Sequence, residues 1–96
     1  MTKAEIVNKI VKETAIEKSE VLQIVEAFME EVRNSLSVGE NVYLRGFGTF
    51  LIKHRAEKAG RIISQDKAIT IPAHNIPYFK PSKVFAEVVE TANDKD

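Results

Sequence analysis

The chain of 96 residues has no cysteine, which excludes a disulfide framework and a thiol nucleophile. Histidine occurs only as His54 and His74, and neither has further ligand residues nearby at helix or strand spacing. The sequence also has no apolar run near the ~18 residues of a membrane span, and no signal peptide at its start. We therefore expect a cytoplasmic protein without a bound metal, a membrane or a small-molecule substrate.

An enzymatic function is also not expected. Gly46-Phe47-Gly48 lacks the third glycine and the following helix of a phosphate-binding loop. The carboxylates of Glu26, Glu30 and Glu31 fit the solvated side of a helix rather than a catalytic pair. We expect no catalytic residue and no cofactor.

The apolar fraction of 44% argues against disorder, and the length allows one domain. Apolar residues at helical spacing predict a helical body over 1–38, with Thr2 and Glu5 as a capping box. A period of two follows, which predicts strands over 41–80. Within them, 53–76 forms a hairpin arm with its tip at 60–67, and Ser82 begins a last helix over 82–91.

The zero net charge hides a strong segregation of charge along the sequence. Between Arg45 and Lys83 there are eight basic residues and two acidic ones, so this segment carries six excess positive charges. The rest of the chain carries the opposite excess. Such a patch on one segment is typical of a nucleic-acid interface, although a solvated hairpin with scattered lysines would also fit.

The apolar side chains exceed what one small protomer can enclose. The second helix has a wide apolar stripe that includes Phe28, and Phe47, Phe50 and Phe79 add to it. The arm, in contrast, has too few large apolar residues to pack against a body, so it should project. We therefore predict a dimer with these phenylalanines in a shared core, and a ligand that covers the arm.

The arm carries Lys53, Arg55, Lys58 and Arg61, which suit the phosphate backbone or a groove. Lys53 and Arg55 share a strand face, and Lys58 joins them only if a bulge or twist intervenes near residues 56–57. Ile62-Ile63 at the tip has two interpretations. The isoleucines pack across the hairpin or against a neighbour, or they form an apolar wedge that enters between base steps.

Several motifs together resemble the bacterial HU and integration host factor family of histone-like DNA-binding proteins, over about residues 1–91. The motifs are Gly46-Phe47-Gly48-Thr49-Phe50, Arg55, Gly60-Arg61, Ile69-Thr70-Ile71-Pro72-Ala73 and Pro77-x-Phe79-Lys80-Pro81. The resemblance implies an α+β fold, in an intertwined dimer with a helical body, a β-saddle and two protruding arms. It also implies arms that embrace the DNA minor groove, without catalysis or a cofactor.

The resemblance assigns roles to individual residues. Those expected to contact DNA are Lys3, Lys53, Arg55, Lys58, Arg61, Ile63, Lys80 and Lys83, with Ile63 as the wedge and the lysines at 3, 80 and 83 on flanking phosphates. Phe28, Phe47, Phe50 and Phe79 are assigned to the dimer core.

The chain departs from the family pattern at several of these positions. Ile62-Ile63 replaces the usual Asn-Pro of the arm tip, Asp66 replaces a glycine, and Lys58 replaces a frequent arginine. The last helix has Ala86, Glu87 and Glu90 where relatives are often basic, which reduces the expected flanking footprint.

We predict a nucleoid-associated protein that binds double-stranded DNA with little sequence specificity, bends it and condenses the chromosome, with a preference for bent or nicked duplexes. A site-specific integration host factor subunit is the near alternative, and a heterodimer with a related chain is open beside the homodimer. An RNA-binding or scaffold protein is a more distant alternative, which competition between duplex DNA and duplex RNA would distinguish.

Overall fold

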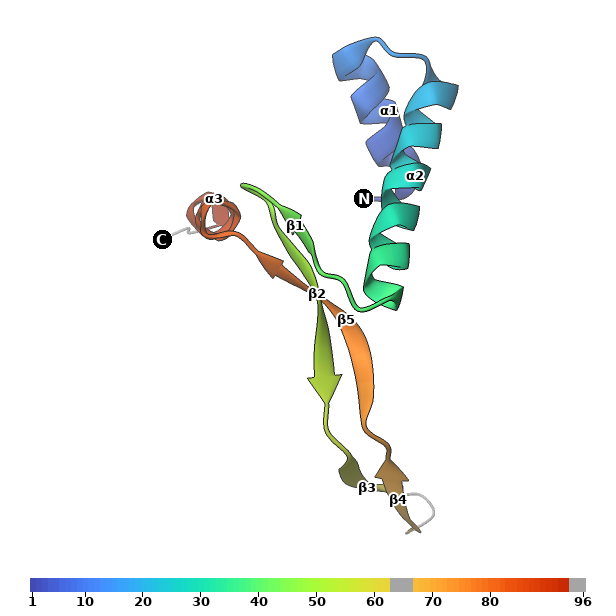
Figure 1. Cartoon of the computed structure of the whole chain (residues 1–96). Coiled ribbons are helices and arrows are strands. Elements are labelled where there is room, and N and C mark those ends of the chain that lie inside the picture. The colour runs from blue at the N-terminus through green and yellow to red at the C-terminus, as the bar shows by residue number, and fades with distance from the viewer. Residues whose placement is uncertain (63–66, 94–96) are drawn as a thin grey trace. The chain divides into compact units, whose positions relative to one another are not determined.

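The computed structural model describes residues 1–62 and 67–93, and the chain divides into two compact units, Met1–Ser35 and Leu36–Asp96. The first unit is helical, and the second holds the strands and the last helix (Figure 1). The elements in chain order are α1 (Lys3–Thr14), α2 (Lys18–Ser37), β1 (Val42–Leu44), β2 (Gly48–Arg55), β3 (Lys58–Ile62), β4 (Lys67–Ile71), β5 (His74–Pro81) and α3 (Lys83–Asn93).

The first unit is a pair of helices whose ends are set by local hydrogen bonds. The Oγ1 of Thr2 caps α1 by accepting a hydrogen bond from the backbone N–H of Glu5 at 3.2 Å. Ala15 ends the helix in a left-handed conformation, with φ of 60°, and its N–H donates to the carbonyl of Val11. Val7 of α1 and Val21 of α2 are buried. Helices α1 and α2 thus lie in the range for which the sequence predicts helices, and the second helix starts at Lys18.

A turn around Gly39 follows α2. Gly39 has φ of +85°, a conformation that L side chains rarely adopt, and its N–H donates to the carbonyl of Leu36 at 3.1 Å. The chain then enters β1, where the apolar period changes from helical to alternating, as the sequence predicts.

The strands β1, β2 and β5 form an antiparallel sheet with β2 in the centre. The turn between β1 and β2 needs Gly46, which has φ of +80°. Because β5 is an edge strand, it accommodates Pro77 and Pro81, which have no N–H to donate. The register pairs Phe50 with Phe79 and Lys53 with Ile76.

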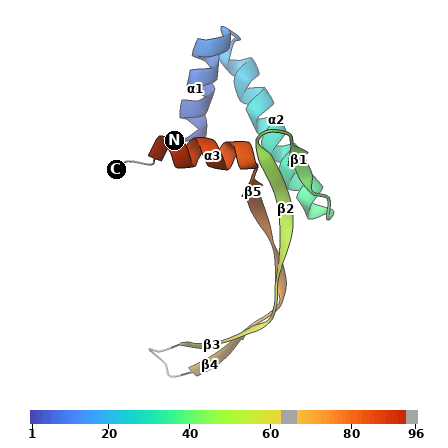
Figure 2. The same cartoon turned by 90° about the vertical axis from the view of Figure 1, so that its left-hand side faces the viewer.

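The arm continues beyond this sheet as a separate antiparallel pair, β3 and β4. The pairing stops after Arg55 and His74 and resumes at Lys58 and Ile71, so that residues 56–57 lie unpaired opposite 72–73. Figure 2 shows the arm turning sharply at this level. The pairing is therefore interrupted near 56–57, where the sequence left open a bulge or twist, and Pro72 contributes because it cannot donate a ladder hydrogen bond.

The position of the hairpin tip is a correction to the sequence prediction. The tip was expected over 60–67, but β3 extends through Ile62 and β4 already begins at Lys67. Gly60 pairs with Ile69 inside the ladder, where the side chains of Ile69 and Ile71 lie beside it. Gly60 therefore belongs to the paired strand and not to the turn.

Four phenylalanines pack together where the three-stranded sheet meets α3. Ring centroids lie 4.9 Å apart for Phe50 and Phe79, 5.2 Å for Phe47 and Phe79, and 5.0 Å for Phe47 and Phe85. Ser82 caps α3 by accepting a hydrogen bond from the N–H of Phe85, which confirms the predicted start of the last helix. Within 1–62 and 67–93, no helix is long and apolar enough to cross a membrane.

Gly48 offers a test of this packing. A Cβ atom added there would lie 2.6 Å from the carbonyl oxygen of Lys80 and 2.6 Å from the ring of Phe79. Gly48→Ala should therefore lower the free energy of unfolding by about 1–3 kcal/mol, because the backbone of β5 has to shift. Urea unfolding monitored by circular dichroism measures this change.

Gly60→Ala is the matched control, since its added methyl would lie 3.5 Å from Ile69, an ordinary contact. We expect this variant to unfold close to the parent midpoint. Equal midpoints for the parent protein and Gly48→Ala would contradict the packing described here.

Candidate nucleic-acid interface

The pairing of β2 with β5 sorts their side chains onto two faces. Alternation places Phe50 and Ile52 on one face of β2, and Lys53 and Arg55 on the other. We call the face that carries Lys53 and Arg55 the cationic face, and the strand register shows which residues of β1 and β5 lie on the same side. Its members are Tyr43 of β1, Thr49, Leu51, Lys53 and Arg55 of β2, and His74, Ile76, Tyr78 and Lys80 of β5.

Lys53 is held on this face by an aromatic ring. Its Nζ lies 4.3 Å from the ring centroid of Tyr78, two residues away along the neighbouring strand. The side chain of Lys53 is half-buried, whereas that of Arg55 is exposed at the end of the paired segment. The prediction that Lys53 and Arg55 share a strand face is therefore confirmed, and Lys53 also contacts the Tyr78 ring.

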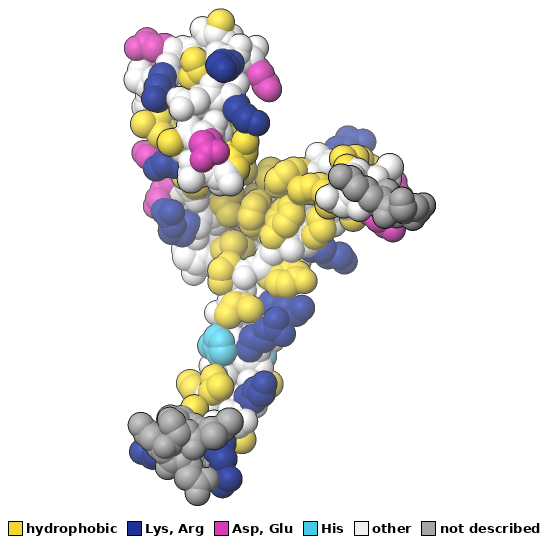
Figure 3. Space-filling view, turned by 180° about the vertical axis from the view of Figure 1, so that it is seen from behind, with side chains coloured by type: hydrophobic (Ala, Val, Ile, Leu, Met, Phe, Trp, Pro, Cys, Tyr) yellow, Lys and Arg dark blue, Asp and Glu magenta, His cyan; other side chains and the backbone are white. Residues whose placement is uncertain are grey.

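Beyond the unpaired residues 56–57, the other two predicted cations of the arm lie on different faces of β3. Lys58 and Arg61 are both exposed, but they lie on opposite faces of β3. Lys67 of β4 shares the face of Lys58 and was not among the predicted contacts. Positive charge therefore surrounds the arm instead of following a single side. Figure 3 shows Lys and Arg side chains along the arm on the face it displays.

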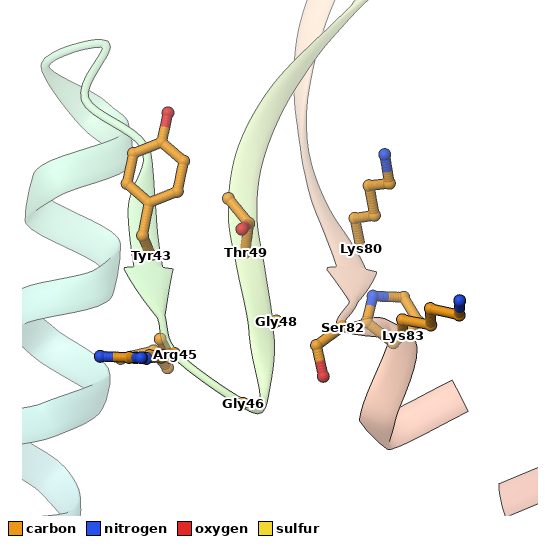
Figure 4. Close-up of a pocket in the computed structure, with 10 residues that line it drawn as sticks. Tyr43, Arg45, Gly46, Gly48, Thr49, Lys80, Ser82 and Lys83 are labelled. Carbon is orange, nitrogen blue, oxygen red and sulfur yellow. The ribbon is translucent and has the colours of Figure 1, made fainter. Parts of the chain in front are cut away.

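A hollow of about 490 Å³ lies where the cationic face meets the start of α3. Lys80 and Lys83 supply its positive charge, and Tyr43, Thr49 and Ser82 add polar groups, whereas the side chain of Arg45, which also lines the hollow, points away from the two lysines (Figure 4). Among the described residues that line the hollow, none is acidic. The first turn of α3 also has no acidic residue, so the partial positive charge of the helix N-terminus adds to the charge of the two lysines.

The hollow brings together Lys80 and Lys83, which were predicted, with Arg45, which was not. Arg45 follows β1, and the β1–β2–β5 order carries it to the same place as residues 35 or more positions later. The sequence contained one signal for it, the position of Arg45 directly before Gly46-Phe47-Gly48. The order β1–β2–β5, which brings these segments together, could not be predicted from composition or residue spacing.

Lys3 belongs to the first unit and has a different environment. Its Nζ lies 2.8 Å from the Oε1 of Glu26 in α2, and both side chains are about half exposed. A phosphate would have to compete with this carboxylate, so we expect Lys3 to contribute less to phosphate binding than an unpaired lysine would. Ile63, the predicted wedge, lies outside the described residues.

The four residues assigned to a dimer core differ in their surroundings. Phe50 and Phe79 are half-buried in the aromatic cluster, while Phe47 is 46% exposed although it stacks on Phe85. Phe28 of α2 is also 46% exposed. Across the described parts of the chain, only Val7 and Val21 are buried hydrophobic side chains. These apolar surfaces therefore have room for a partner.

The histidines are engaged in hydrogen bonds at the root of the arm. His54 Nδ1 lies 2.9 Å from Asn75 Oδ1 across the strands, and His74 Nδ1 lies 2.9 Å from the carbonyl oxygen of Pro72. Among residues 1–62 and 67–93, no three His, Cys, Asp or Glu side chains form a group that could hold a metal ion.

Comparison with known proteins identifies the family. The family described as "Bacterial DNA-binding protein" matches residues 1–90. DNA-binding protein HU of Staphylococcus aureus is 37% identical over 90 residues, which cover 94% of this chain and all of that protein. Integration host factor subunit beta of Marinobacter nauticus is 36% identical over 96 residues, covering 99% of this chain and 98% of that protein.

A solved structure agrees with the sequence relatives. The Anabaena HU–DNA cocrystal structure superposes with a TM-score of 0.88 and 30% identity, covering 93% of this chain and 97% of that chain. The identity to the integration host factor subunit, 36%, is no higher than the 37% identity to HU, so the comparison does not favour integration host factor over HU. The chain therefore belongs to the family of bacterial DNA-binding proteins that includes HU and integration host factor, a family of architectural proteins and not of enzymes.

Proposed function

We propose that this protein acts as an HU-type architectural protein, which binds double-stranded DNA as a dimer through the cationic face, the arm and the hollow at α3. The observation that carries the proposal is the row of cations from Lys83 and Lys80 to Lys53 and Arg55 along one antiparallel sheet. The Anabaena relative was crystallised with DNA, which supports the same ligand here.

The chemistry of the cations favours recognition of the backbone over recognition of sequence. Lysine and arginine neutralise phosphates, whereas specific reading needs side chains that reach base edges. The hollow adds the N-terminus of α3, whose capped first turn attracts a phosphate oxygen without selecting a base. We therefore propose that Lys53, Arg55, Lys58, Arg61, Lys80 and Lys83 bind phosphates or line the minor groove, with little sequence preference.

Dimerisation completes the fold in this proposal. One chain leaves large apolar side chains exposed in both units, among them Ile24 at 61%, Val84 at 62% and Val88 at 62%. Exposed apolar surface of this extent on so small a protein is typical of an obligate interface. In this proposal Phe28, Phe47, Phe50 and Phe79 belong to the shared core, and the whole chain is a single HU-type domain.

The arm enters the minor groove, and Ile63 acts as the wedge that opens a base step and bends the duplex. Bent or nicked DNA then binds more tightly, since part of the deformation has already been made. In the cell, we place the protein in the cytoplasm on the nucleoid, where such bending condenses the bacterial chromosome.

Salt dependence tests the assignment of the cations. The logarithm of the duplex binding constant should fall with the logarithm of salt concentration by about 0.9 for each phosphate contacted. Arg55→Ala and Arg61→Ala should each flatten this slope by roughly one unit. Lys9→Ala, which removes an exposed charge from α1, is the control and should leave the slope unchanged. A slope that Arg55→Ala and Arg61→Ala do not alter would exclude the arm from the interface.

Concentration dependence tests the dimer. The melting temperature should rise with protein concentration, because unfolding and dissociation are coupled. Phe28→Ala should lower it by several degrees, although this ring is 46% exposed in one chain, because a partner covers it. Glu31→Ala, an exposed position of the same helix, should change it little. A folded monomer in sedimentation at micromolar concentration would rule the obligate dimer out.

Energy transfer between dyes at the ends of a duplex tests the wedge. Ile63→Ala should reduce the bend and the preference for nicked DNA, while the salt slope stays the same because no charge is lost. Ile63→Pro, which restores the residue typical of the family, should retain both. If Ile63→Ala bends DNA as strongly as the parent protein, bending comes from charge neutralisation alone.

A further inference from the structure

The cationic face carries the only two tyrosines of the chain, Tyr43 and Tyr78, and the chain has no tryptophan. Tyr43 is 74% exposed and Tyr78 is 41% exposed. Neither ring belongs to the phenylalanine cluster, because alternation along β1 and β5 turns both to the opposite side of the sheet. The face that carries the DNA-directed cations therefore also presents aromatic surface.

The register interleaves these rings with lysines. Tyr43 pairs with Thr49, and Thr49 pairs with Lys80, so a ring and an ammonium group flank one small side chain in a single row. Neighbouring strands lie roughly 4.8 Å apart, which puts the Cα atoms of Tyr43 and Lys80 roughly 10 Å from each other. A base over Tyr43 and a nearby phosphate at Lys80 fit this spacing.

The second ring repeats the arrangement farther along the sheet. Tyr78 pairs with Leu51 and has the Nζ of Lys53 4.3 Å from its ring centroid. Contacts within the chain cover only part of the surface of the Tyr43 and Tyr78 rings. The Tyr78 ring supports Lys53, and the Tyr43 hydroxyl accepts a long hydrogen bond of 3.4 Å from Asn41, which leaves the Tyr43 ring exposed.

Aromatic rings among cations are the combination with which proteins hold single-stranded nucleic acid, since every base has a face that stacks on a ring. The bases of an intact duplex are already stacked on one another and cannot use such rings. We propose that Tyr43 and Tyr78 form a stacking platform for the unpaired bases of single-stranded DNA. This inference rests on the proposed DNA binding and adds a ligand class to it.

Tyrosine fluorescence of the unmodified full chain reports directly on this platform, because Tyr43 and Tyr78 are its only two tyrosines and it has no tryptophan. Single-stranded oligothymidylate should quench the emission strongly, and duplex DNA of the same length should quench it less. Tyr43→Phe leaves Tyr78 as the single reporter, and Tyr78→Phe leaves Tyr43. Each remaining tyrosine should still be quenched, because phenylalanine preserves the stacking partner.

Affinity provides the second measurement. Tyr43→Leu and Tyr78→Leu should each weaken oligothymidylate binding by about tenfold, while both phenylalanine variants bind like the parent protein. Duplex affinity should fall by a smaller factor than oligothymidylate affinity in both leucine variants, since every cation is retained and only the contact of Tyr78 with Lys53 is lost. An unchanged circular dichroism spectrum shows that each variant is folded.

The outcomes separate the two proposals. If the parent protein binds duplex DNA but oligothymidylate neither quenches its tyrosines nor distinguishes leucine from phenylalanine, the stacking platform is wrong and the proposed function stands. If the parent protein binds neither DNA, the proposed function fails, and the platform fails with it.

Discussion

The pairing of β2 with β5 is the constraint on which the rest of the protein depends. Eight consecutive residue pairs, from Gly48 with Pro81 to Arg55 with His74, fix which side chains share a face. A shift by one residue would send Phe50 to the side of the cations and Lys53 to the side of the aromatic cluster. Gly48 holds this register from one end, because the Phe79 ring and the β5 backbone occupy the space of a side chain. One pairing thus creates both the apolar face and the charged one.

Charge segregation along the sequence becomes segregation in space through the same sheet. Eight of the fourteen basic residues lie between Arg45 and Lys83, on or beside the strands and at the start of α3, whereas only two of the fourteen acidic residues lie there. Cations gathered on one surface repel one another, and a polyanion relieves that repulsion. The protein is therefore neutral as a whole and still carries a surface suited to DNA. The interruption between the sheet and the β3–β4 pair lets the arm change direction while its backbone stays paired on both sides.

Much of this organisation was predictable from the sequence because local rules govern it. Helical spacing placed α1 and α2, Thr2 and Ser82 marked helix starts through their capping chemistry, and alternation placed Lys53 and Arg55 on one face. Contacts between segments distant in sequence were not predictable from these rules. The hollow that both Arg45 and Lys80 line depends on strand order, and the Lys3–Glu26 ion pair depends on how two helices pack. The tip was placed too early, because Gly60 pairs with Ile69 inside the β3–β4 ladder and the strand continues through Ile62.

The central claim is that DNA lies on the cationic face and in the hollow at α3. Backbone amide chemical shifts, recorded by NMR while a short duplex is added, test this claim residue by residue. The account predicts shifts that concentrate in β2, β5, the turn at Gly46 and the first turn of α3, and that continue into the arm. Amides at the end of α1, around Thr14, should stay in place. Shifts confined to α1 and α2, with β2 and β5 unaffected, would contradict the account.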